Sequence, residues 1–355
     1  MGVKKRQSVP VGTVRIMVKD MTPYEKTKTS WKQSTKQFLE VTHIVKLFKL
    51  HKNLKVLIDT NDSHFLKGQL SSNGIPQGAR ITILPNGDVL DKAFSLFSKN
   101  LVIHDQLSDD HWDIMYQNKG GTYAYCYTLD KKNRHRNEKF QKVWMFDKVY
   151  KKLSTNVEKA LKDKQDHFAL PMYTLLTTHM RIGNEIYYRA HGHKGLTTLK
   201  KKDINVHGNI VIFNYIAKDG VPRHIEHTFP SVYVNRLKNH LTKCKQNDFV
   251  FASAETGHPL PEHHFKEAFK KYCGIEFYPH IIRSHYATTQ VKQFLKGKRT
   301  ISKRDADTLF LSIAEQLGHK RFIKKEHVWK NNYTVTVNHY VQPELVAKVK
   351  SLIGK

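Results

Sequence analysis

The stretch "THMRIGNEIYYRAHGHKGLTTLKKKDINV", residues 178 to 206, decides how the second half of this chain is organised. It follows the apolar run "FALPMYTLL", and the spacing over residues 168 to 191 predicts one helix that ends near Gly195. Arg181 falls within this helical stretch, where an arginine either emerges at a surface or is held in a cleft by an anion. The alternative is a structural salt bridge with Glu185, one turn along.

Three apolar runs with strand character follow the same stretch. "DINV", "IVIFNYI" and "VPRHIEHTF" are separated by the turn sequences "HGN" and "AKDG", which predicts a β-hairpin. Lys218 lies in the second turn, where a long side chain can reach out of the sheet. Lysines at hairpin turns are usually solvated, so Lys218 carries little weight on its own.

Helical spacing dominates the rest of the chain beyond residue 150. Arg283 falls at the start of one predicted helix, where backbone N–H groups and the helix dipole favour an anion. His280, three residues earlier, could flank the same pocket. His319 follows Gly318, which we expect to end another helix. The further predicted helices are 154–165, 231–244, 262–272, 283–296, 305–317 and 337–350.

The first 150 residues have a different character. Residues 1–78 form a basic region of mixed pattern, with one helix predicted around Leu39, Ile44 and Leu47 and a Gly/Ser/Pro-bearing loop, "KGQLSSNGIPQG", at its end. From residue 79 the segments "ARITILPNGDVLD" and "WDIMYQNKGGTYAYCYTLD" show short alternating runs with turns at Pro-Asn-Gly and Gly120-Gly121, which predicts a small β-rich domain. The basic segment "KKNRHRNEKFQKVWMFDKVYKKL" then leads into the helical part.

Composition narrows the class of partner. The 355 residues include 60 Lys and Arg against 31 Asp and Glu, a formal net charge of +29. Such a surplus makes a polyanion, and nucleic acid above all, the expected partner; a ribosome-associated or merely soluble basic protein is the alternative. Three scattered cysteines favour neither a disulfide framework nor a zinc site, and no apolar run is long enough to cross a membrane. We therefore expect a soluble, intracellular, DNA-associated protein without a metal or cofactor.

The order of the candidate residues is more informative than any one of them. An arginine, a hairpin lysine, a second arginine, a Gly-His at a helix end and a late tyrosine in "NHYVQPEL" (338–345) follow one another along the chain. In this order the chain resembles type IB DNA topoisomerases of the viral and bacterial kind over most of residues 79–355. The resemblance is carried by the motifs "RIGNEIYYRAHGHKGLTTLKKKDI", "IVIFNYIAKDG", "IIRSHYATTQ", "AEQLGH" and "HYVQPEL".

The resemblance implies a fold and a reaction. The fold would be of the α+β class, with a β-rich amino-terminal domain and bridge (79–150) and a mainly helical catalytic domain (151–355) that contains a β-hairpin. Together they would form a clamp around double-stranded DNA, with no need for an oligomer and with 1–78 as an extension of unknown role. Tyr340 would form a 3′-phosphotyrosyl bond, Arg181 and Arg283 would bind the non-bridging phosphate oxygens, His319 would donate to one of them, and Lys218 would protonate the leaving 5′ oxygen. Supercoiled DNA would be relaxed without ATP or metal.

Two departures from the family pattern keep alternatives open. His280 occupies a position where family members commonly carry lysine, and "HIIRSHYAT" is closer to the His-x-x-Arg box of tyrosine recombinases, so a recombinase or integrase is the second hypothesis. Tyr340 lies 21 positions after His319, a longer spacing than the family pattern, and Tyr333 lies between them as a second candidate nucleophile. A basic DNA-binding protein of the same fold without catalysis is the third hypothesis.

Overall fold

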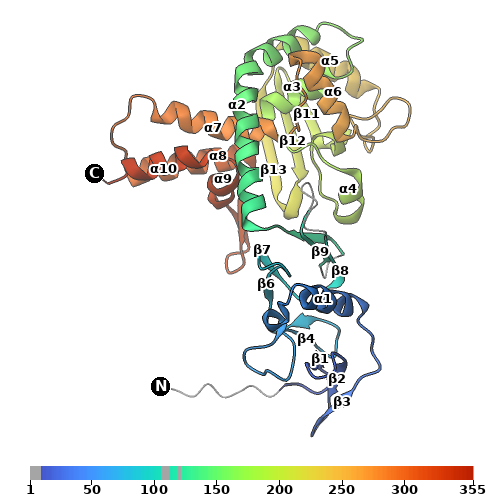
Figure 1. The fold of residues 1–355 in the computed structure, drawn as a ribbon. Coiled ribbons are helices and arrows are strands. Elements are labelled where there is room, and N and C mark those ends of the chain that lie inside the picture. The colour runs from blue at the N-terminus through green and yellow to red at the C-terminus, as the bar shows by residue number, and fades with distance from the viewer. Residues whose placement is uncertain (1–8, 105–111, 119–120, 355) are drawn as a thin grey trace. The chain divides into compact units, whose positions relative to one another are not determined.

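The computed structural model describes residues 9–104, 112–118 and 121–354, and Figure 1 shows its elements. The chain divides into two compact units, Met1–Glu138 and Lys139–Lys355. The division falls inside the long helix α2 (Leu129–Ala160), rather than at the boundary near residue 150 that the sequence predicted.

The first unit is rich in short strands. One antiparallel sheet has the order β3-β2-β1-β4-β5, a second has the order β10-β9-β8, and β6 and β7 form a separate hairpin. The helix α1 (Leu39–Leu50) accompanies them. The strands are β1 (Val14–Ile16), β2 (Pro23–Lys26), β3 (Trp31–Gln33), β4 (Gln69–Leu70), β5 (Pro76–Gln77), β6 (Ile81–Ile83), β7 (Val89–Phe94), β8 (Lys99–Ile103), β9 (Ile114–Gln117) and β10 (Tyr123–Cys126).

A single hydrophobic core joins the parts of this unit. Ile44 and Phe48 belong to the same buried cluster as Phe94 and Ile114, so the core crosses residue 78, where the sequence predicted a boundary. The core crosses residue 78 because the apolar faces of α1 and β1 pack against apolar residues of the strands after residue 79. The predicted β9–β10 pairing is present; Gly120 of its predicted turn lies outside the described residues.

The helix predicted around Leu39 is present, but it buries a different face. Its buried residues are Val41, Ile44, Val45 and Phe48, spaced by three, one and three positions as one stripe of an α-helix requires. Leu39 is 75% exposed.

The second unit combines a three-stranded antiparallel sheet with helices, and Figure 1 shows α3, α5 and α6 beside the sheet and α7, α8 and α10 gathered together. Two hydrophobic cores correspond to these groups. The strands of the sheet, in the order β11-β12-β13, are β11 (Ile204–His207), β12 (Ile210–Ile216) and β13 (Pro222–Thr228). The helices are α3 (Ala169–Thr178), α4 (Glu185–His191), α5 (Ser231–Thr242), α6 (Glu262–Cys273), α7 (Ile281–Leu295), α8 (Lys303–Leu317), α9 (Thr334–His339) and α10 (Pro343–Leu352).

This α+β organisation confirms the predicted fold class, and the predicted hairpin and most helices agree within a few residues. The prediction of one helix over 168–191 was wrong, because His179 ends α3 in the left-handed region (φ 55°) and α4 begins only at Glu185. Gly192, not Gly195, ends α4.

The remaining helix predictions also need correction at two places. The helix predicted over 154–165 is the last part of α2, which begins at Leu129 and ends at Ala160. The helix predicted over 337–350 is two helices, α9 and α10, with Tyr340 at the break and Pro343 as the first residue of α10. The hairpin of β14 (Lys320–Ile323) and β15 (Val328–Asn331) was not predicted. None of the helices in the described part of the chain is long and apolar enough to span a membrane.

Candidate active site

Arg181 lies in the irregular segment between α3 and α4, and the Gly-Leu-Thr-Thr-Leu sequence holds this segment in place. Leu196 N–H donates to the Arg181 carbonyl at 2.8 Å, and Thr197 N–H donates to the Ile182 carbonyl at 2.7 Å. A Cβ atom at Gly195 would lie 2.6 Å from the Arg181 carbonyl oxygen, so only glycine allows this close approach. The alternative salt bridge with Glu185 is not formed, because Glu185 pairs with Arg189 and His258.

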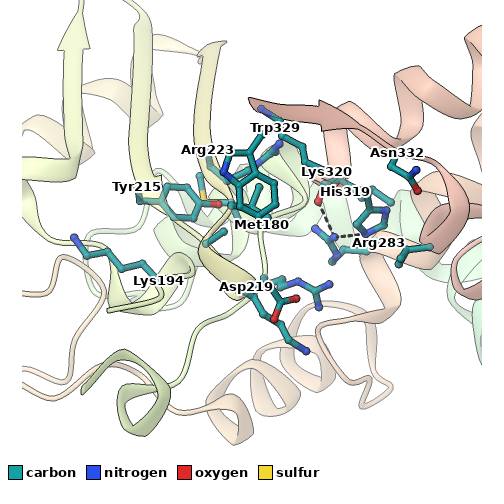
Figure 2. Close-up of a pocket in the computed structure, with 17 residues that line it drawn as sticks. Met180, Lys194, Tyr215, Asp219, Arg223, Arg283, His319, Lys320, Trp329 and Asn332 are labelled. Carbon is teal, nitrogen blue, oxygen red and sulfur yellow. Dashed lines mark hydrogen bonds between the residues drawn. The ribbon is translucent and has the colours of Figure 1, made fainter. Parts of the chain in front are cut away.

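The Lys218 side chain is exposed at the turn between β12 and β13, as the sequence predicted. Its neighbour Asp219 has a left-handed backbone (φ 63°), which lets the chain reverse within three residues. Both residues line the pocket that Figure 2 shows.

Arg283 is the third residue of α7, and its side chain is fully enclosed rather than lying at the surface of the helix start. Its guanidinium donates to the carbonyls of His179 (2.6 Å) and Leu317 (2.8 Å) and to Nε2 of His319 (3.1 Å). The buried Nε–H has no hydrogen-bond partner among the described residues. Burial lowers the pKa of Arg283 to about 10, so the side chain is still a cation at neutral pH.

His319 leaves α8 through Gly318, which has a left-handed backbone (φ 70°). Arg223 packs against this glycine, where a Cβ atom would lie 2.7 Å from its side chain, and it donates to the carbonyls of Glu315 and Gln316 at the end of α8. This cap fixes the point at which the chain turns to present the imidazole.

The two nitrogens of the His319 ring have different partners. Nδ1 lies 2.8 Å from Oγ1 of Thr336, and Nε2 faces Arg283. Because a guanidinium only donates, Nε2 is the acceptor, and we assign the proton to Nδ1, which donates to Thr336. Burial, followed by the positive charges of Arg283 and Arg181, lowers the pKa of His319 to about 3, so the ring is neutral at physiological pH.

Tyr340 brings its hydroxyl group to the edge of this cluster. Arg181 Nη2 donates to the Tyr340 oxygen at 3.0 Å, and His280 Nε2 lies 3.1 Å from the same oxygen. The tyrosine ring is buried, with the Arg283 guanidinium 5.3 Å and the Lys139 Nζ 5.2 Å from its centroid.

The other candidate nucleophile, Tyr333, faces a different neighbour. Its hydroxyl donates to Asp307 Oδ1 at 2.8 Å, and its ring contacts Phe310. The Asp307 carboxylate raises the pKa of Tyr333, which disfavours the phenolate. Tyr333 therefore contacts α8, whereas the Tyr340 hydroxyl contacts Arg181 at the edge of the pocket.

Four of the five predicted residues line one pocket, and the fifth, Tyr340, adjoins it through Arg181. Figure 2 shows cations converging on this pocket from the sheet, from α7 and from the segment after α8. Its basic lining residues are Arg181, Lys194, Lys218, Arg223, Arg283 and Lys320, against one carboxylate, Asp219. Such a pocket suits an anion, and within the described ranges no group of His, Cys, Asp and Glu side chains could hold a metal ion.

Three contributors were not fully recognised from the sequence. His280 was noted as a flanking residue; desolvation of its ring and the nearby cations lower its pKa, so it is a neutral acceptor beside Tyr340. Lys139 donates to the carbonyl of His339, and burial lowers its pKa to about 8, yet it is one of many lysines in its segment and no pattern distinguishes it. Thr336 lies four residues before Tyr340, a helical spacing that could have indicated a shared face.

Comparisons with known proteins identify the family of the chain. The family described as "Eukaryotic DNA topoisomerase I, catalytic core" matches residues 129–343. Because this match covers more than half of the chain, the chain belongs to that family. A search of curated proteins found no match.

Two solved structures are similar to part of the chain. Both are of the XerH site-specific recombinase, one bound to difH substrate in a pre-cleavage complex and one bound to palindromic difH substrate in a post-cleavage complex. Each is 17% identical, with TM-scores of 0.31 and 0.32, and each match covers 46% of this chain and 45% of the recombinase chain. The chain thus matches less than half of the length of these proteins.

Proposed function

We propose that this protein is a type IB DNA topoisomerase, which cuts one strand of duplex DNA, permits rotation and reseals the strand without ATP or a metal ion. One observation carries the proposal: the Tyr340 hydroxyl lies 3.0 Å from Arg181 and 3.1 Å from His280, at the edge of a pocket that contains Arg283, His319 and Lys218. The arrangement places a nucleophile, the Tyr340 hydroxyl, next to a proton acceptor, His280, and next to fixed cations.

In the proposed step the Tyr340 oxygen attacks a DNA phosphorus in line with the bond to the 5′ oxygen. A 3′-phosphotyrosyl bond forms as the bond between phosphorus and the 5′ oxygen breaks. The tyrosine proton passes to His280 Nε2, which already faces the hydroxyl, and Lys218 donates a proton to the departing 5′ oxygen. Since one phosphoester replaces another, the reverse step reseals the strand without an energy source.

The two arginines and His319 would stabilise the charge on the non-bridging phosphate oxygens. Arg283 is held by two carbonyls and still has an unpaired Nε–H, a donor that an anion would satisfy. Preorganised donors of this kind need little rearrangement when charge develops, and the loss of one typically costs on the order of a hundredfold to a thousandfold in rate.

A supercoiled plasmid tests the proposal. In buffer with EDTA and no ATP, the wild-type protein should relax both positive and negative supercoils, and Tyr340→Phe should relax neither. Tyr333→Phe is the matched control and should keep activity. Failure of the wild-type protein to relax either substrate would refute the topoisomerase assignment.

A tyrosine recombinase is the second candidate, favoured by His280 three positions before Arg283 and in contact with the Tyr340 hydroxyl. A recombinase would require defined DNA sites and the assembly of several protomers. A topoisomerase would act as a monomer and would relax any supercoiled plasmid. A basic DNA-binding protein without catalysis would form no covalent adduct on either substrate.

A further inference from the structure

We infer that the β14–β15 hairpin, residues 320–331, is a second DNA contact that grips the phosphate backbone beside the catalytic pocket; this inference rests on the proposed function. The hairpin lies between His319, just after α8, and the start of α9.

The hairpin begins and ends at the site. The Asn332 N–H donates to the His319 carbonyl at 2.9 Å and closes the base of the hairpin on the histidine itself. Lys320 and Trp329 line the same pocket as Arg283 and His319, and Figure 2 labels all four. A DNA strand whose phosphate enters the pocket must therefore pass next to the hairpin.

The strand register gives the hairpin two different faces. Phe322 pairs with Trp329, and their ring centroids are 5.3 Å apart, so aromatic packing stabilises the face that also carries Lys320. On the other face Arg321 stands directly opposite Lys330.

Two like charges opposite one another destabilise a hairpin unless an anion lies between or beside them. Arg321 is exposed, and its side chain makes no hydrogen bond or ion pair with any residue in the described ranges. Within the described part of the chain, the only ion pair of the Lys330 side chain is with Glu326, an exposed pair of small energetic value.

The charge of the hairpin matches a phosphate backbone. Its 12 residues, "KRFIKKEHVWKN", carry five Lys and Arg and one Glu, and the side chains of Arg321, Lys324, Lys325 and Lys330 are exposed. The alternative is a polar turn that is merely solvated. Such a turn would not require a packed aromatic pair that places its cations beside an anion-binding pocket. Contacts of this kind position a duplex without reading its sequence.

Charge reversal on the outer face tests the inference. The double variant Arg321→Glu/Lys330→Glu should weaken binding to a 30-base-pair duplex by roughly tenfold or more at 150 mM salt, measured by fluorescence anisotropy. The slope of log Kd against log salt concentration should fall by about two, one for each lost phosphate contact. The matched control, Lys238→Glu/Lys243→Glu, makes the same change in net charge on α5 and just after it, and should keep the wild-type slope.

Three outcomes separate the possibilities. If Arg321→Glu/Lys330→Glu keeps the affinity and salt slope of the wild-type protein, the hairpin inference is overturned. If both double variants lose affinity equally, the effect is one of net charge and the inference also fails. The binding assay needs no catalysis, so a wild-type protein that forms no covalent adduct would refute the proposed function without deciding the role of the hairpin. Thermal unfolding of each variant, with a transition like that of the wild-type protein, excludes misfolding.

Discussion

At the scale of single residues, Thr336 has the most specific role beyond the five predicted side chains. Its hydroxyl accepts a hydrogen bond from the Nδ1–H of His319, over 2.8 Å. To donate to a phosphate oxygen, the neutral imidazole must carry its proton on Nε2 instead, and Nδ1 then becomes an acceptor. A hydroxyl can change from acceptor to donor and satisfy both tautomers.

We therefore expect Thr336→Val to slow strand cleavage by about tenfold to a hundredfold, because a buried nitrogen would be left without its partner. Thr336→Ser, which keeps the hydroxyl, should restore most of the rate. The measurement is single-turnover cleavage of a duplex oligonucleotide. If Thr336 acts through His319, the valine substitution should have little further effect in a His319→Gln background, whereas equal losses in both backgrounds would show a merely structural role.

His319 also makes stability depend on pH. Its pKa is about 3 in the folded protein and near 6.5 when unfolded. Well above pH 6.5 the imidazole is neutral in both states and the pKa difference contributes nothing to stability. As the pH falls below 6.5, only the unfolded state takes up the proton, so the free energy of unfolding decreases until about pH 3.

At pH 5.5 this linkage amounts to about 1.4 kcal/mol relative to pH 7.5. Urea unfolding at the two pH values should show a smaller pH-dependent loss in His319→Gln than in the wild-type protein by about this amount. His43→Gln, at an exposed position of α1, serves as the control. An unchanged difference in His319→Gln would contradict a neutral buried imidazole.

At the scale of elements, Gly195 determines where Arg181 lies. A Cβ atom there would be 2.5 Å from the Gly183 nitrogen, closer than any real contact. We expect Gly195→Ala to cost about 2 kcal/mol or more in unfolding free energy and to reduce plasmid relaxation, since the Arg181 segment must move. Gly208→Ala is the control: its φ is 57°, but nothing lies within 4 Å, so it should cost about 1 kcal/mol and keep activity.

The elements also show what the sequence could predict. Apolar periodicity, turn sequences and glycine stops placed the β11–β13 sheet and most helices, because these signals are local. The break between α3 and α4 could not be read in this way, since it depends on Gly195 approaching a backbone twelve residues earlier in the sequence. The β14–β15 hairpin was missed because its strands are four residues each and mix lysine with aromatic residues.

At the scale of the whole molecule, the net charge of +29 predicts how strongly salt affects binding. If the protein neutralises about six to ten phosphates, affinity for duplex DNA should fall roughly a thousandfold or more between 50 and 200 mM salt. Titration by fluorescence anisotropy measures this directly. A Kd that changes less than tenfold over that range would be inconsistent with an extended backbone grip.

The order of the candidate catalytic residues along the chain predicted the pocket better than any local pattern did. Arg181, Lys218, Arg283 and His319 come from different elements, and the fold brings them to one pocket. The order did not predict that His280 accepts a hydrogen bond from the Tyr340 hydroxyl or that Lys139 lies over the Tyr340 ring. These contacts depend on the packing between elements, which determines which histidine or lysine lies close to Tyr340. The sequence also did not predict that residues before and after residue 78 share one hydrophobic core, because that too depends on packing between elements.

The most direct test of the proposed mechanism is to identify the residue that becomes attached to DNA. The protein is incubated with a duplex oligonucleotide that loses its 5′-hydroxyl fragment on cleavage, quenched with detergent and digested, and the nucleotide-bearing peptide is sequenced by mass spectrometry. We predict a 3′-linked nucleotide on Tyr340 and no adduct in Tyr340→Phe. A nucleotide on Tyr333, or no adduct at all with the wild-type protein, would contradict it.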